Sequence, residues 1–108
     1  MLRYIRGGRF PRQFPRPWGG QKVLWVASPD YEGPILIRGH QLSRRWWLGF
    51  DGAGGRPYAE MRLLKPTANP GHAWRQFPSY TRVRARGCYA YQIDGTNFST
   101  VVVFRAEG

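Results

Sequence analysis

Residues 86–106, RGCYAYQIDGTNFSTVVVFRA, contain the pattern that decides the fold. Two apolar and aromatic runs, 88–93 and 98–105, flank Asp-Gly-Thr-Asn, a composition typical of a four-residue hairpin loop. In the first run Tyr89 and Tyr91 alternate with smaller or polar residues, which makes one face of the strand aromatic. The stretch therefore predicts an antiparallel hairpin with one buried face.

Five further segments of this kind precede the hairpin: residues 22–28, 34–39, 44–50, 57–64 and 80–86. Turn residues separate them, and no window has the apolar spacing of a helix. The 108 residues are the length of about one domain, and 14 Gly with 9 Pro favour many turns. We therefore predict one all-β domain over residues 22–108, a sandwich or barrel of about seven strands, with a long loop at 66–79.

Alternation also orients the side chains of the segment 44–50. In 44–50, Trp46, Leu48 and Phe50 point inward, which leaves Arg45 and Trp47 outward.

The run Val101-Val102-Val103-Phe104 is apolar on both faces of its strand. Either this strand is central and covered twice, or the N-terminal segment packs over its outer side with Phe10, Phe14 and Trp18. The sequence leaves both arrangements open, beside a third in which the N-terminal segment is solvated.

Residues 1–21 differ in composition from the rest of the chain. Three prolines and four glycines disfavour a helix or a central strand, so we predict a basic, irregular arm. We expect no signal peptide, because no apolar core follows Met1, and no transmembrane segment, because no run of 18 apolar residues occurs. The arginines of the arm are Arg3, Arg6, Arg9, Arg12 and Arg16.

The segment 86–106 resembles the last two strands of an immunoglobulin-like sandwich. Gly87-Cys88-Tyr89 stands where a Gly-x-Tyr opens the penultimate strand and its ring closes a corner, and Tyr91 stands where antibody-type domains keep an inward cysteine. The cysteine pair is missing, and Ala85 replaces the acidic residue before the Gly. Residues 22–106 are similar to small Ig-like domains of uncharacterised bacterial proteins, many of them in the envelope or exported. The resemblance implies a seven-stranded antiparallel sandwich and such a location, but no active site.

Patterns that indicate catalysis or metal binding are weak. His40 and His72 lie in predicted loops, the six acids are scattered, and no serine stands in a Gly-x-Ser-x-Gly motif. The glycine-rich segment 51–57 lacks the ending of a phosphate-binding loop. Cys88 is the one cysteine, so it forms no intrachain disulfide, and we expect a small buried thiol. We expect no enzymatic activity, no cofactor and no metal site.

The charge is strongly positive: 17 Lys and Arg face six acids, a net charge of +11. Arginine predominates, and its planar fork suits carboxylate and phosphate. Arg82, Arg84 and Arg86 alternate along a predicted strand and form either an anion-binding stripe or a solvated strand face. The candidate partner-binding residues are Arg44, Arg45, Trp47, Trp74, Arg75, Arg82, Arg84 and Arg86.

These observations predict a non-enzymatic binding or assembly module that contacts another protein or an anionic surface. The alternative is a nucleic-acid-binding protein that uses the arm and the arginine stripe, with arginine and tryptophan for phosphates and bases. A hydrolase is a distant third. The sequence leaves the oligomeric state open.

Overall fold

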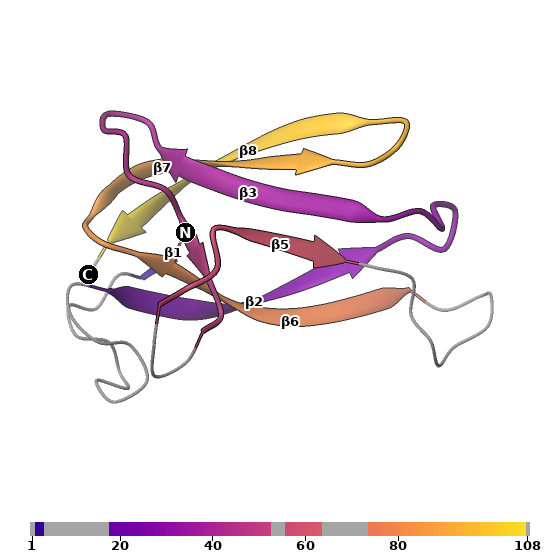
Figure 1. The fold of residues 1–108 in the computed structure, drawn as a ribbon, viewed down its shortest axis with the longest axis horizontal. Coiled ribbons are helices and arrows are strands. Elements are labelled where there is room, and N and C mark those ends of the chain that lie inside the picture. Colours follow the sequence, from indigo (N-terminus) through magenta and orange to yellow (C-terminus); the bar gives the residue numbers. More distant parts are fainter. Residues whose placement is uncertain (1, 4–17, 53–55, 64–73, 108) are drawn as a thin grey trace.

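The computed structural model describes residues 2–3, 18–52, 56–63 and 74–107, which fold into two packed β-sheets (Figure 1). The strands are β1 (Leu2–Arg3), β2 (Gly19–Ala27), β3 (Ile35–Gln41), β4 (Gly49–Phe50), β5 (Glu60–Leu63), β6 (Arg75–Val83), β7 (Gly87–Asp94) and β8 (Ser99–Glu107). Within the described ranges there is no helix, and so no helix that could cross a membrane. The predicted all-β class is confirmed.

The larger sheet has the order β1-β8-β7-β3-β5, and the smaller has the order β2-β6-β4. All pairings are antiparallel except that of β1, which runs parallel to the last two residues of β8. All seven predicted strands are present, and the two sheets pack as a sandwich. From β1 to β7 consecutive strands alternate between the two sheets, and β8 stays beside β7, so the core collects side chains from strands that are far apart in the sequence.

Several strand boundaries differ from the prediction. β2 begins at Gly19, inside the predicted arm, and β6 begins at Arg75, inside the predicted loop. Pro78 made that part of the chain look irregular, but it lies where β6 pairs with β2 alone, because β4 reaches only Thr81 and Arg82. A proline is tolerated there, since one side of the strand needs no ladder hydrogen bond.

The predicted strand at 44–50 is wrong in its first half. Residues 42–45 form bends, Trp47 makes an isolated bridge back to His40, and β4 itself is two residues long. The orientation of the second half is confirmed: Leu48 and Phe50 are buried and Trp47 is exposed.

The core combines buried aliphatic side chains with a group of aromatic rings. Tyr91 of β7 contacts Phe104 of β8 and Trp25 of β2, with ring centroids 4.6 and 4.9 Å apart. Its hydroxyl shares a 2.7 Å hydrogen bond with the buried Thr81 of β6 and so ties one sheet to the other. Burial raises the pKa of Tyr91 to about 12, although the bond with Thr81 acts in the opposite direction.

The connection between β6 and β7 is closed by a tyrosine. Tyr89 is fully buried, and its hydroxyl donates to the carbonyl of Ala85 at 2.6 Å. The burial of Tyr89 and Tyr91 confirms the predicted inward face of β7.

The outer side of β8 is exposed. Val101 and Val103 are 59% and 60% exposed, so the arrangement with a central strand covered on both faces is wrong for the described residues, whereas Phe10 and Phe14, the proposed cover from the N-terminal segment, lie outside them. β8 lies at the edge of the described sheet, because β1 pairs only with Ala106 and Glu107.

Candidate functional site

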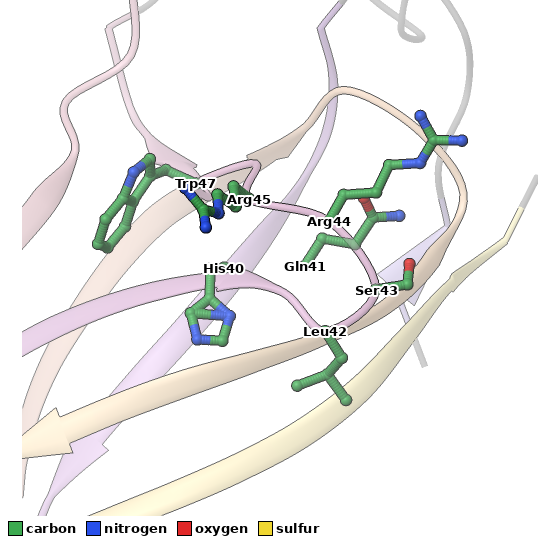
Figure 2. A pocket seen from close by; sticks show the side chains of 7 residues that line it. All are labelled: His40, Gln41, Leu42, Ser43, Arg44, Arg45 and Trp47. Carbon is green, nitrogen blue, oxygen red and sulfur yellow. The ribbon is translucent and has the colours of Figure 1, made fainter.

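The loop after β3 forms an open pocket of about 410 Å³. We call it the 40–47 site; it is lined by His40, Gln41, Leu42, Ser43, Arg44, Arg45 and Trp47 (Figure 2). Three of the predicted partner-binding residues, Arg44, Arg45 and Trp47, therefore lie together.

Backbone hydrogen bonds fix the two ends of this loop. Gln41 N donates to Trp46 O, and Leu48 N donates to Gly39 O, each at 2.8 Å. Gly39 has to be a glycine here, because a Cβ would lie 2.4 Å from the carbonyl oxygen of Ala90. The loop thus leaves the sheet from a tightly packed base.

A buried amide joins the loop to the bend between β6 and β7. Gln41 is 4% exposed, and its Nε2 donates to Arg86 O at 3.1 Å. Its Oε1 is buried and has no hydrogen-bond partner among the described residues, which costs on the order of 1–3 kcal/mol. Gly87, with a φ of 143°, lies against the same amide, so Arg86 is held beside the 40–47 site.

The side chains of the site combine positive charge with exposed aromatic surface. Trp47 is 56% exposed and meets His40 edge-on, with 6.3 Å between ring centroids. The guanidinium of Arg44 lies 5.1 Å from the centre of the Trp46 ring, and Arg45 is exposed. Figure 2 shows the Arg44 side chain extending away from the end of the site where His40 and Trp47 meet. This arrangement favours a ligand with carboxylates or phosphates next to a flat apolar group.

The predicted arginine stripe is wrong at Arg82, which is fully buried. Its Nη1 donates to the carbonyls of Asp51 and Gly52, both at 2.8 Å, and its guanidinium lies 5.5 Å from the Trp18 ring. Alternation places the residue correctly on the outer face, but these groups cover it. Desolvation lowers the pKa of Arg82 from its ordinary value.

Glycines beside Arg82 make room for this cover. Gly20 of β2 and Gly49 of β4 are its neighbours on either side of β6. A Cβ on Gly49 would lie 2.4 Å from the Pro57 ring and 3.3 Å from Trp18. The turn that caps Arg82 is itself held in place, because the Asp51 carboxylate, on a residue with a φ of 49°, accepts hydrogen bonds from Ser79 Oγ and Tyr80 N.

The other two arginines of the stripe lie in the bend after β6. Arg84 and Arg86 are exposed, and the guanidinium of Arg84 stacks on Trp18 from 4.7 Å.

Arg75 and Trp74 do not join the 40–47 site. Arg75 is buried, and it donates to the carbonyls of Gly33 and Tyr31 at 3.1 and 2.7 Å. Trp74 is exposed, but it lies at the opposite end of the nine-residue β6, on the order of 30 Å from Arg84. The residues that sequence reasoning grouped by composition are therefore split between two ends of the sandwich.

Cys88 is exposed, so the predicted buried thiol is wrong. It lies on β7 opposite Arg105 and alternates with the inward Tyr89.

Several candidate residues lie outside what the structure describes. Arg3 is part of β1, but its side chain is not described, and Arg6, Arg9, Arg12, Arg16 and His72 lie outside the described residues. Among the residues that are described, no group of three His, Cys, Asp or Glu side chains could hold a metal ion.

Sequence reasoning missed Gln41 and the contribution of His40 to the site. His40 was expected in a loop but ends up on β3, opposite Trp47. No local signal identifies Gln41, because its partner, Arg86, is distant in the sequence.

Comparison of the chain with protein-family models, with curated proteins and with solved structures finds no match.

Proposed function

We propose that this protein is a non-enzymatic binding module with an Ig-like sandwich, which holds an acidic segment of a partner protein at the 40–47 site. The observation that carries the proposal is that the exposed Trp47 lines one pocket with Arg44 and Arg45, on a loop with a fixed base. Trp and Arg are the residue types most enriched among interface hot spots. A rigid base lowers the entropy lost when a partner binds.

The Ig-like part of the proposal rests on strand order and on two tyrosines. Neighbours β8-β7-β3 in one sheet and β2-β6 in the other correspond to G-F-C and B-E of an immunoglobulin domain. The bond from Tyr89 to Ala85 has the geometry of a tyrosine corner. The Trp25–Tyr91 contact joins β2 and β7, the strands that the immunoglobulin disulfide joins. The short β4, which precedes β5, departs from that order.

An acidic protein is favoured over nucleic acid because of Arg82. A row of three outward arginines along one strand would match a phosphate backbone, but Arg82, which lies on β6, is buried, and Arg84 and Arg86 lie in the bend after that strand. The remaining exposed cations around the site belong to bends and loops, a distribution that suits carboxylates on a folded or extended partner.

The test is binding of a fluorescein-labelled peptide that contains several Asp and Glu and one Tyr, followed by anisotropy. We expect a dissociation constant in the micromolar range, about 10⁻⁶ to 10⁻⁵ M. R44S/R45S should weaken binding about tenfold or more, and W47A should do the same. The matched control R56S/R62S removes the same charge at exposed positions elsewhere and should change binding less than about threefold.

Equal weakening by both double variants would show that only net charge matters and would overturn the site. Tight binding of mixed-sequence RNA with a steep salt dependence, and none of the peptide, would establish the nucleic-acid alternative in its place.

A further inference from the structure

We infer that two copies of this chain associate through their β8 edges, in antiparallel register about Val102, to form one continuous sheet. This inference goes beyond the proposed function and uses an edge two strands away from the β3 loop.

The first observation is the exposed apolar surface of β8. Val101, Val102 and Val103 are 59%, 43% and 60% exposed, on both faces of the strand. A long apolar edge strand of this kind is one that proteins otherwise protect with charge, proline or a covering segment. Between Thr100 and Phe104 this strand has no charged residue and no proline.

The second observation is that the backbone of this edge is turned outward. Gly95 N donates to Phe98 O at 2.9 Å, which closes the hairpin. Opposed residues in an antiparallel pair alternate between hydrogen-bonded and non-bonded positions. From the register of β7 and β8, the N–H and C=O groups of Ser99, Val101 and Val103 therefore point away from β7. In the described part of the sheet no strand pairs with these three residues.

The third observation is that the edge is complementary to itself. With Val102 opposite its own copy, Val101 lies opposite Val103 of the second copy, and both have outward backbone groups. Each such pair exchanges two backbone hydrogen bonds and sets one β-branched side chain against another, a favourable cross-strand pair. If the register shifted by one residue, backbone N–H and C=O groups that point toward the second copy would lie opposite groups that point back toward β7. These hydrogen bonds would then be lost.

Charge supports the same register. Arg105 of one copy falls opposite Ser99 of the other, and the hydroxyl of Ser99 donates to the Asp94 carboxylate at 2.7 Å. All three side chains point to the outer face, since Asp94 pairs with Ser99 and Cys88 with Arg105 in β7 and β8. Strands are about 4.8 Å apart, so the long Arg105 side chain reaches an acid two strands away. Each end of the seam thus sets a cation toward an anion, although each copy carries +11 overall.

The seam is short, so we expect a reversible dimer with a dissociation constant on the order of 10⁻⁵ M. Sedimentation velocity on the full chain, over a concentration series that spans this value, should show a monomer–dimer equilibrium. V101K/V103K sets Lys opposite Lys across the seam and should weaken association about tenfold or more. V101E/V103K sets Glu opposite Lys and should associate within about threefold of the wild type.

The control L24K/V26K adds the same two charges to exposed apolar positions on β2, and it should not change the equilibrium. Thermal melting checks that each variant is folded, which the exposure of all four positions favours. The inference is overturned by a monomeric wild type throughout the series, by open-ended oligomers without a discrete dimer, or by equal dissociation of the two charge variants.

Discussion

Arg82 and Arg84 lie two residues apart against the same indole ring, yet one is buried and the other is exposed. The difference arises from what each guanidinium contacts besides Trp18. Arg82 donates to two backbone carbonyls in the turn after β4, whereas Arg84 lies in the bend after β6, next to solvent. Two identical side chains therefore have different expected roles, one in holding the fold and one at the surface.

Substitution of these two arginines should separate the roles. R82A leaves the carbonyls of Asp51 and Gly52 without their donor and opens a cavity, so we expect a loss of about 2–4 kcal/mol in the free energy of unfolding. R84A removes an exposed stacking contact and should cost less than about 1 kcal/mol. Urea unfolding at neutral pH measures both, and equal costs would contradict the assignment.

The element that shows the limits of sequence reasoning is β6. Period-two alternation predicted the inward faces of β7 and of residues 48–50, because that pattern depends only on neighbours along one strand. It also put Arg82 on the correct face, but the cover over Arg82 comes from Trp18 and the turn at 51–52, far away in the sequence. Arg44, Arg45 and Trp47 could be grouped from the sequence because they are close neighbours along the chain. The burial of Arg75 by carbonyls of the β2–β3 connection could not be predicted locally.

The connection between β6 and β7 gives a prediction at the scale of an element. Y89F removes the hydroxyl that donates to Ala85 O and leaves the ring in the core. We expect a loss of about 1–2 kcal/mol in the free energy of unfolding. Relative to the wild type, Y89F should accelerate amide hydrogen exchange more in the bend at 84–86 than in β3. A variant with uniform acceleration over the whole sheet would instead assign the hydroxyl a global role.

At the scale of the whole molecule, one hydrogen bond joins the middle of the two sheets. Tyr91 lies on β7 of the larger sheet and Thr81 on β6 of the smaller sheet. Both residues are buried, and their hydroxyl groups are hydrogen-bonded to each other. Because burial favours the neutral phenol, the folded-state pKa of Tyr91 is above the ordinary value of 10.0. The stability that this group contributes is full below pH 10 and is lost as the pH rises to about 12.

The free energy of unfolding should therefore fall by about 2 kcal/mol between pH 10 and 12 through Tyr91 alone. Y91F should be less stable at neutral pH, because Thr81 keeps an unpaired hydroxyl, but it should lose less stability over that alkaline range. Y91F/T81V removes both polar groups and should recover part of the loss. Urea titrations at pH 8, 10 and 12 would contradict this picture if wild type and Y91F declined in parallel.

The Tyr91–Thr81 bond also determines which agents can separate the two sheets. A cystine between the sheets would be cleaved by thiols, and it has no proton to lose as the pH rises. A phenol that is hydrogen-bonded to a hydroxyl group is deprotonated by base, and thiols do not react with it. Because the chain has one cysteine, its fold requires no oxidant to form and loses nothing to a reductant. The contact between the two sheets should therefore depend on pH and not on the redox conditions.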